Sequence, residues 1–369
     1  GAARTIVARN IFGGMCARVC PTETLCEDVC VRAEADGGPV RIGELQRLAT
    51  DRLIQTGEHP FTRAAATGRK VAVVGAGPAG LACAHALSRA GHDVIVFEAH
   101  EKPGGLNEYG LASYKTPDDF ARREVDWLLS LGGIEVRTGL TLGKDVTLAQ
   151  LRKVYDAVFL GLGLGGANRL GLENEDMEGV HDAIDYIAAL RQTDDLSSLP
   201  VGRHVLVIGG GMTAIDIAVQ VKKLGADDVT ILYRRGPDEM KASLFERQLA
   251  QTSGVVIRFY GKPVRLVEEG GRLGAVETEC TLTGERQVVK TDQLFKAIGQ
   301  SLLADGLENE GLAIEHGRIR TDEQRRTSLA GVWAGGDCIS GGDDLTVSAV
   351  EDGKQAAASI NAFLAGEPS

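Results

Sequence analysis

A glycine-rich turn between two apolar runs constrains this chain more than any other feature. The apolar, mostly β-branched run 71–74 is typical of a parallel strand buried on both faces. It is followed by Gly75, Gly77 and Gly80 in G-x-G-x-x-G spacing, then by a helical pattern and a second apolar run that ends at Glu98. This order of strand, glycine turn, helix, strand and acid predicts a dinucleotide-binding βαβ unit.

Each part of this unit has a physical role in binding a dinucleotide. Gly75 permits the tight turn, Gly77 lets the backbone approach a pyrophosphate, and Gly80 allows the helix to pack close to the strand. The pyrophosphate would face the helix N-terminus, and Glu98 would accept hydrogen bonds from ribose hydroxyls. The glycine pair 104–105 adds a second close-approach point and favours FAD. The alternative is a glycine-rich turn in another kind of α/β protein.

A second unit of the same kind begins at the apolar run 204–208. Residues 209–214, Gly-Gly-Gly-Met-Thr-Ala, lead into a helical pattern, and the next strand ends at Arg234 and Arg235. An NAD site would carry an acid at this position, whereas two guanidinium groups suit a 2′-phosphate. The sequence therefore favours NADPH over NADH. The alternative is that both arginines are solvated surface residues.

Four of the seven cysteines lie within fifteen residues, at Cys16, Cys20, Cys26 and Cys30. A threonine in 22–24 is expected to cap a helix that carries Cys26 and Cys30, whose i,i+4 spacing would place both thiols on one face. No secretory signal is visible, so this crowding favours metal over disulfides. Iron–sulfur ligation, a zinc site with poor spacing, and free thiols stay open as alternatives.

The charge balance narrows the class of protein. A net charge of −11 argues against nucleic-acid or anionic-membrane binding as the main role, and we expect a cytoplasmic protein. The chain begins with Gly1 rather than Met, which we interpret as an incomplete N-terminal region. No Ser-His-Asp, H-E-x-x-H or C-x-x-C motif accompanies the first glycine turn, so no catalytic side chain is predicted and hydride transfer would be left to the cofactors.

The chain is therefore predicted to be an α/β protein with two Rossmann-like units after a helical segment. The expected domains are residues 1–67 (helical, cysteine-bearing), 68–167 with 300–369 (FAD), and 168–299 (NAD(P)). Residues 42–57 read as a helix ended by glycine, and residues 255–284 read as hairpin β structure.

These motifs, in this order, resemble a known family. A FAD fingerprint, an inserted NAD(P) fingerprint and a late Gly-Gly-Asp at 335–337 are similar to glutathione-reductase-like flavoproteins. The segments CARVCPTETLCEDVC, IGELQ, GAGPAG, GGGMTA, YRR, AIG, GGD and TVSAVEDGK resemble, more closely, the electron-input subunit of dihydropyrimidine dehydrogenase and the related glutamate synthase small subunit. The resemblance covers essentially the whole chain.

The resemblance implies a set of binding residues at the matching positions. Lys115 stands where the family usually has arginine, and Cys16 matches a family cysteine that is not a ligand. The implied FAD contacts are Gly75, Gly77, Pro78, Ala79, Gly80, Glu98, Gly105, Leu106, Lys115, Gly336, Asp337, Leu345 and Thr346. The implied NAD(P) contacts are Gly210, Gly211, Met212, Thr213, Arg234, Arg235, Lys241, Ala297, Ile298 and Gly299. The implied ligands of [4Fe–4S] clusters are Cys20, Cys26, Cys30 and Gln46.

The function implied by the resemblance is an NAD(P)H:FAD oxidoreductase subunit in pyrimidine catabolism. It would pass electrons through [4Fe–4S] clusters to an FMN-containing partner subunit that reduces uracil or thymine. The alternative is a glutamate synthase small subunit that feeds a glutamate-forming partner. In the family the clusters share ligands with an earlier cysteine-rich stretch, so this chain alone is not expected to bind both.

Overall fold

The structure is a computed structural model that describes residues 1–34, 37–303, 307 and 310–366. The chain divides into two compact units. The first unit comprises Gly1–Glu108, Lys115–Gly165 and Leu302–Ser369, and the second comprises Tyr109–Tyr114 and Gly166–Ser301.

The first unit is built on a five-stranded sheet in which every neighbouring pair is parallel, in the order β17-β4-β1-β2-β3. In its central pairs Val71 lies opposite Val94 on one side and Ala157 on the other. The strand predicted at 71–74 is confirmed, and its four residues are buried because both faces of the sheet are covered. The strands are β1 (Lys70–Val74), β2 (Asp93–Phe97), β3 (Ile134–Arg137), β4 (Ala157–Leu160) and β17 (Val332–Ala334).

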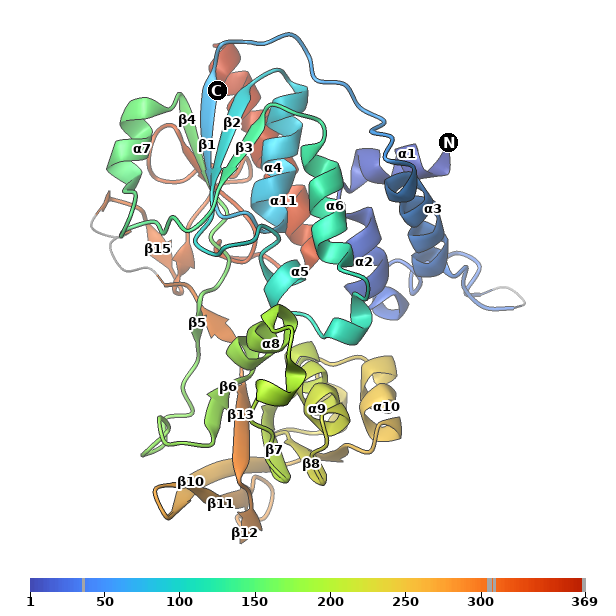
Figure 1. Cartoon of the computed structure of the whole chain (residues 1–369), viewed down its shortest axis with the longest axis vertical. Helices are drawn as coiled ribbons and strands as arrows, with labels where there is room; N and C mark the ends of the chain where they lie inside the picture. The colour runs from blue at the N-terminus through green and yellow to red at the C-terminus, as the bar shows by residue number, and fades with distance from the viewer. Residues whose placement is uncertain (35–36, 304–306, 308–309, 367–369) are drawn as a thin grey trace. The chain divides into compact units, whose positions relative to one another are not determined.

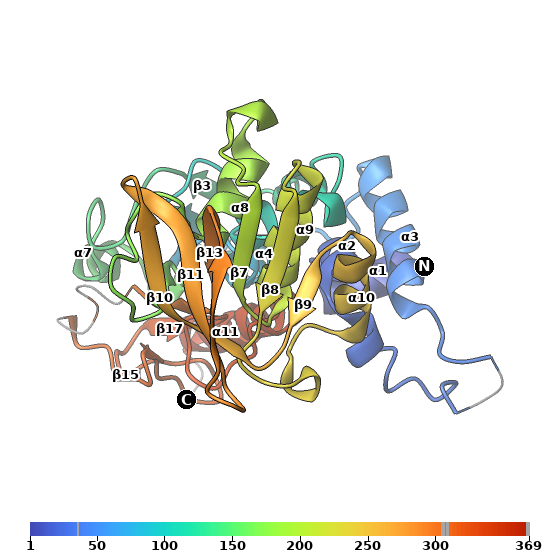
Figure 2. The same ribbon diagram turned by 90° about the horizontal axis from the view of Figure 1, so that it is seen from below.

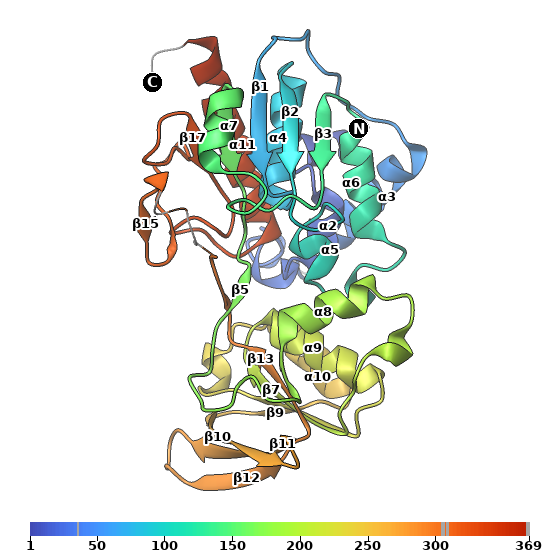
Figure 3. The ribbon, with the colours of Figure 1, turned by 60° about the vertical axis from the view of Figure 1, so that its left-hand side comes forward.

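Two long helices lie side by side in this unit, α4 (Pro78–Arg89) and α11 (Thr346–Ala365) (Figure 3). They approach closely because small residues form the contact: a Cβ on Gly353 would strike the carbonyl oxygen of Ala79. The other elements are α5 (Leu106–Tyr109), the 3₁₀ turn η2 (Ser113–Lys115), α6 (Phe120–Leu129), α7 (Leu148–Val154) and a small β15–β16 pair (Ile314–Glu315, Arg318–Ile319).

The N-terminal helices α1 (Ala2–Arg9), α2 (Gly13–Val19) and α3 (Ile42–Thr56) also belong to the first unit, with α2 and α3 lying near α6 (Figure 1). The predicted helix over 42–57 is confirmed, since α3 ends at Gly57 in the left-handed conformation that glycine favours. None of the described helices is long and apolar enough to cross a membrane.

The prediction of a helix that carries Cys26 and Cys30 is wrong. After the 3₁₀ turn η1 (Thr22–Thr24) the chain continues in turns through residue 29. The expected cap does not form, because the Thr24 hydroxyl donates backward to the carbonyl of Pro21 at 3.0 Å instead of accepting from a following N–H. The two thiols therefore do not share a helix face.

The second unit has its own parallel sheet in the order β6-β13-β7-β8-β9, and Figure 2 shows β13, β7 and β8 side by side. A three-stranded antiparallel sheet, β10-β11-β12, confirms the predicted hairpins over most of 255–284, but β9 is a parallel edge strand of the main sheet rather than part of a hairpin. The strands are β5 (Gly166–Ala167), β6 (Val180–Asp182), β7 (His204–Gly209), β8 (Asp228–Leu232), β9 (Val256–Arg258), β10 (Gly261–Glu269), β11 (Arg272–Cys280), β12 (Arg286–Lys290), β13 (Gln293–Ala297) and β14 (Gln300–Ser301). The helices are α8 (Ala183–Gln192), α9 (Met212–Lys223) and α10 (Leu244–Thr252), with 3₁₀ turns η3 (Leu196–Ser198) and η4 (Pro237–Glu239).

Candidate functional site

The first glycine turn joins β1 to α4 and is shaped by steric demands that only glycine meets. Gly75 has φ +95°, and a Cβ on it would strike the carbonyl oxygen of Gly161. A Cβ on Gly80 would strike the carbonyl oxygen of Gly75. At Gly77, by contrast, a Cβ would meet only the Cα of Gly105, at 3.8 Å, so the backbone here borders open space. No side chain caps the N-terminus of α4, which leaves its N–H groups available to an anion.

The glycine pair 104–105 forms the opposite wall of this space. The N–H of Gly104 donates to the carbonyl of Ala76 at 2.8 Å, and a Cβ on Gly105 would lie 2.7 Å from the Cα of Gly77. Both glycines have positive φ. The backbones of residues 75–77 and 104–105 thus lie close together with no side chain between them. They form a cradle that side chains would fill.

Glu98 directly follows β2 and is buried beside the turn. It accepts hydrogen bonds from the N–H of Ala76 at 2.7 Å and from both the N–H and the Nδ1 of His100 at 2.9 Å. Burial acts to raise the pKa of Glu98, but the hydrogen bonds from His100 and Ala76 outweigh it, and the pKa lies below its usual value. The ionised carboxylate has about four lone-pair sites, so it retains capacity for a ribose hydroxyl.

The Gly-Gly-Asp sequence follows β17 and lies against the start of α4. A Cβ on Gly336 would lie 2.9 Å from the Cβ of Ala79, and the N–H of Gly336 donates to Asp352 at 2.9 Å. Burial, reinforced by repulsion from Asp344, raises the pKa of Asp337 to about 6. In the described part of the chain the Asp337 carboxylate makes no hydrogen bond to another residue, so it has acceptors for a bound hydroxyl.

A buried polar side chain that the sequence did not single out, Asn107 of α5, lies beside the N-terminus of α11. Thr346 donates to the Oδ1 of Asn107 at 3.1 Å, while the Nδ2 of Asn107 is enclosed without a hydrogen-bond partner among the described residues. An unsatisfied buried donor is costly, and a bound group with an acceptor would satisfy it. Asn107 follows Leu106 directly, so its position beside the predicted flavin segment was the only available signal.

The remaining predicted FAD residues are placed by the ends of the same elements. Pro78 and Ala79 are the first residues of α4, and Leu106 is the first residue of α5. Leu345 is the N-cap of α11, which has no side-chain cap. Lys115 ends the turn η2 and is half-buried. Glycine cradle, buried Glu98 and the unsatisfied amide together fit a dinucleotide.

The second glycine turn joins β7 to α9 in the second unit. A Cβ on Gly209 would strike the carbonyl oxygen of Ala297, and a Cβ on Gly210 would strike the ring of Tyr233. Gly211 borders open space, and α9, which begins at Met212, has no side-chain cap. These N–H groups are therefore available to a second pyrophosphate. Thr213 lies in the first turn of α9 and Ala214, at the third fingerprint position, is fully buried.

The end of β8 presents the predicted cations. The carbonyl of Arg234 accepts from Thr281 at 3.0 Å and the carbonyl of Arg235 accepts from the N–H of Tyr260 at 3.1 Å, so the backbone of the pair is held while both side chains are exposed. Arg235 lies 3.8 Å from Glu239, whereas Arg234 and the exposed Lys241 have no acidic partner within the described ranges. Arg234 is therefore the stronger candidate for a phosphate contact.

The segment 297–299 lies beside this turn, at the end of β13, whose last residue is Ala297. Ala297 lies opposite Gly209 in the parallel pairing of β13 with β7. Gly299 has φ +98°, and its carbonyl accepts from the N–H of Asn168 at 3.1 Å. The Nδ2 of Asn168 donates to the carbonyl of Ile298 at 3.3 Å. Because Gly299 has no side chain, the backbone at this point would leave room for a nicotinamide nucleotide.

The cysteine segment is only partly gathered. Cys16 is buried, and its Sγ accepts from the Nδ2 of Asn10 at 3.1 Å. A hydrogen bond between the thiols raises the pKa of Cys16 and lowers that of Cys20, which also receives the backbone N–H of Val347 in the first turn of α11. Cys20 therefore touches the helix whose N-terminus is predicted to face the flavin.

The other predicted ligands lie apart from this contact. Cys26 is exposed and Cys30 is partly exposed, and Gln46 donates its Nε2 to the carbonyl of Gly13 at 2.6 Å. Across the residues that the structure describes, no three His, Cys, Asp or Glu side chains come together to hold a metal ion. The predicted ligands, as placed here, do not fit a complete cluster site.

One residue of structural importance carried no sequence signal. Glu124 on α6 is buried and accepts from the N–H of Gly14 at 2.8 Å and of Met15 at 3.1 Å, at the start of α2. Burial raises its pKa to about 8, although those two N–H groups and Arg18 act to lower it. Gly14 has no Cβ, and one would lie 2.7 Å from the Glu124 carboxylate. This contact joins the N-terminal helix α2 to α6.

Two glycine-turn units, with the second encoded inside the first, define an oxidoreductase with two dinucleotide sites. Residues 69–353 match the family model described as pyridine nucleotide-disulphide oxidoreductase, and the chain belongs to this family. Residues 1–58 match the model described as dihydropyrimidine dehydrogenase domain II, 4Fe-4S cluster. The predicted class, a NAD(P)-dependent flavin oxidoreductase with an N-terminal helical domain, is confirmed.

Relatives of two kinds match nearly the whole chain. The NAD-dependent dihydropyrimidine dehydrogenase subunit PreT of Escherichia coli K12 is 35% identical over 99% of this chain and 85% of its own length. The glutamate synthase [NADPH] small chain of the same organism is 33% identical over 96% of this chain and 81% of its own length. The chain is thus a relative of dihydropyrimidine dehydrogenase electron-input subunits that is also related to glutamate synthase small chains.

Solved structures confirm the fold. Lactococcus lactis thioredoxin reductase matches with a TM-score of 0.67 and 22% identity, covering 81% of this chain and 99% of that one. Mycobacterium tuberculosis FprA in complex with NADPH matches with a TM-score of 0.66 and 18% identity, covering 82% and 87%. At these identities the likeness establishes the architecture alone.

Proposed function

We propose that this chain is the electron-input subunit of a dihydropyrimidine dehydrogenase. It would oxidise NAD(P)H and deliver electrons to an FMN-containing partner subunit that reduces uracil or thymine, in the cytoplasm. The observation that carries the proposal is the presence of two uncapped helix N-termini, α4 and α11, around one glycine cradle, together with a second glycine turn at α9. The similarity to PreT supports this choice of partner reaction.

FAD, when bound, supplies the chemistry by accepting a hydride equivalent from NAD(P)H and passing on electrons singly. The residues of the chain would bind the two cofactors and orient them. The cradle of Gly77 and Gly105 would hold the pyrophosphate, Glu98 the adenosine ribose, and Asp337 a hydroxyl of the ribityl chain. Leu106, Lys115, Pro78, Ala79, Gly75, Gly80, Gly336, Leu345 and Thr346 complete the proposed FAD set.

The second unit would hold the nicotinamide nucleotide. We assign its pyrophosphate to Gly210, Gly211, Met212 and Thr213, and a 2′-phosphate to Arg234, Arg235 and Lys241, with Ala297, Ile298 and Gly299 beside the nicotinamide half. The guanidinium of Arg234, exposed and without an acidic partner among the described residues, favours NADPH. The proposed domains keep the bounds 1–67, 68–167 with 300–369, and 168–299.

The [4Fe–4S] clusters that the matched N-terminal model names are assigned to the intact assembly. Cys20, Cys26, Cys30 and Gln46 remain the proposed contributors, but they do not form a closed ligand set here, so no transfer step is derived through them.

A glutamate synthase small chain is the second candidate, favoured by the 33% identity and by the arginine at the NADP position. The test has two arms. Purified protein with FAD should oxidise NADPH with ferricyanide as acceptor, and a protein that binds no FAD and oxidises neither NADPH nor NADH would refute both candidates. Reconstitution with a PreT-type partner should then yield dihydrouracil formation, whereas glutamate formation with a glutamate synthase large chain would select the second candidate.

A further inference from the structure

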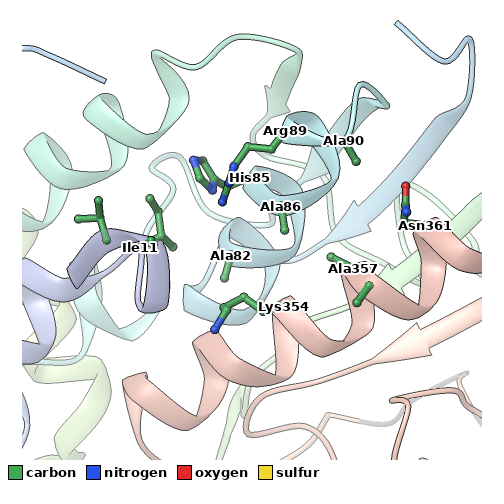
Figure 4. Close-up of a pocket in the computed structure, with 12 residues that line it drawn as sticks. Ile11, Ala82, His85, Ala86, Arg89, Ala90, Lys354, Ala357 and Asn361 are labelled. Carbon is green, nitrogen blue, oxygen red and sulfur yellow. The ribbon is translucent and has the colours of Figure 1, made fainter. Parts of the chain in front are cut away.

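A cavity of about 280 Å³ lies within the first unit, between α1, α4 and α11 (Figure 4). It is away from the N-terminal ends of α4 and α11, where the predicted FAD contacts lie. On the side of α4 and α11 its apolar wall consists of small side chains, including Ala82 and Ala86 from α4 and Ala357 and Ala358 from α11. Alanines leave room here because they are the residues that let these two helices approach.

The polar part of the lining includes two cations. Arg89 and Lys354 both border the cavity and, in Figure 4, extend toward the side on which Ile11 lies. The guanidinium of Arg89 is stacked 4.0 Å above the centre of the Phe61 ring, which fixes its direction without neutralising it.

More cations than acids lie at this place within the described residues. Burial and the nearby charge of Arg4 lower the pKa of Arg89. Within the described ranges neither arginine forms an ion pair, although the protein as a whole carries a net charge of −11. Lys354 donates to the carbonyl of Arg9 at 2.8 Å and pairs with Glu351 at 2.6 Å, so Glu351 is the one acid joined to this group in the described residues. The cluster therefore has an excess of positive charge.

His85 adds a neutral polar surface. Its ring lines the cavity, is only 4% exposed, and has an Nε2 without a hydrogen-bond partner in the part of the chain that the structure describes. Burial, with the adjacent His59 and Arg89, lowers its pKa to about 3. The imidazole is neutral at physiological pH, so it does not add to the charge but can form a hydrogen bond through the ring.

We propose that this cavity binds a small organic anion, whose anionic oxygens pair with Arg89 and Lys354 and whose short apolar body packs on the four alanines. A water molecule occupies about 30 Å³ of the liquid, so a cavity of about 280 Å³ has room for roughly nine groups of that size. A carboxylate of about six carbons is a ligand of this size. The ligand would contact α1, from the N-terminal helices, together with both helices of the flavin-type domain. Its binding should therefore hold α1 in place.

The test is calorimetric titration of the FAD-loaded protein with hexanoate, hexanamide and inorganic phosphate. Saturable binding of hexanoate is expected, at least about tenfold tighter than either of the other two probes, because each lacks the charge or the apolar body. Hexanoate should also slow hydrogen exchange in α1. Absence of saturable hexanoate binding, or equal binding of hexanamide, would overturn the proposal.

Variants test whether hexanoate binding depends on this cavity or only on the charge of the protein surface. Arg89→Gln and Lys354→Met should each weaken hexanoate binding about tenfold or more, because each removes one charge-assisted contact. Ala86→Phe, which fills the cavity and leaves both cations, should abolish binding. The matched controls Arg52→Gln and Lys153→Met, at exposed positions on α3 and α7, should bind as the parent does. Flavin content verifies the fold of each variant, and loss of binding in the controls would contradict the assignment.

Discussion

Replacing Glu124 by glutamine should change how the stability of the N-terminal helices depends on pH. The carboxylate is 1% exposed and caps the first turn of α2 through the N–H groups of Gly14 and Met15. Burial raises its pKa from an ordinary value of 4.5 to about 8. Between these two pH values the native state holds a proton that the unfolded state has released.

The sign of the effect follows from this difference in bound protons. The stabilisation due to Glu124 is fully present below pH 4.5 and is lost as the pH rises through about 8. Each pH unit in that window lowers the free energy of unfolding by up to about 1.4 kcal/mol. Between about pH 5.5 and 8 the parent should therefore lose about 3 kcal/mol relative to Glu124→Gln, whose side chain does not titrate.

Hydrogen exchange of the α2 amides measures this opening free energy, after correction for intrinsic exchange rates at each pH. Asp126→Asn, at an exposed position on the same helix α6, is the matched control and should follow the parent's pH profile. Parallel profiles for the parent and Glu124→Gln would refute the reasoning. They would mean that the helix N-terminus and Arg18 keep Glu124 ionised throughout, so that hydrogen bonding outweighs burial.

Three further predictions concern the proposed cofactor sites. Gly80→Ala should lose FAD, because its Cβ would strike the backbone oxygen of Gly75, which cannot move aside; normal flavin absorbance would contradict this. Asp337→Ala should weaken FAD binding, and in the parent binding should weaken as the pH falls below about 6, where protonation removes the negative charge that strengthens the hydrogen bond; equilibrium titration of the apoprotein measures both, and a flat pH profile would count against the contact. Arg234→Ala should raise KM for NADPH about tenfold and leave KM for NADH within about twofold, whereas Arg203→Ala, at another exposed arginine of the second unit, should change neither; equal changes for both nucleotides would refute a 2′-phosphate contact.

The two glycine-turn units were predictable because their signals are local. A buried parallel strand reads as an unbroken apolar run, and the turn after it demands glycine for reasons of contact distance within a few residues. The strands at 71–74 and 204–208 and the helices that follow them are found where the pattern places them. The helix over 42–57 was predictable for the same reason, since its glycine end is a local backbone requirement.

The helix expected at Cys26 and Cys30 failed because spacing alone does not form a helix. Isolated short helices are marginal without a cap or a packed face. Here Thr24 donates back to Pro21, and the carboxylate of Glu27 is used to accept from the N–H of Gly43 at 2.9 Å. The segment is held by its contact with α3 instead, a contact between residues far apart in sequence.

The sequence by itself determined the order of two dinucleotide units, their glycine turns and the charge at the second strand's end, because these depend on neighbours within about twenty residues. Only the tertiary structure decided that Glu124 caps α2, that Asn107 meets Thr346, and that Arg89 and Lys354 border one cavity. The separation of the two residues along the chain follows no helix or strand periodicity in any of these pairs. Their proximity arises when helices from distant segments pack on the same sheet, which no local pattern records.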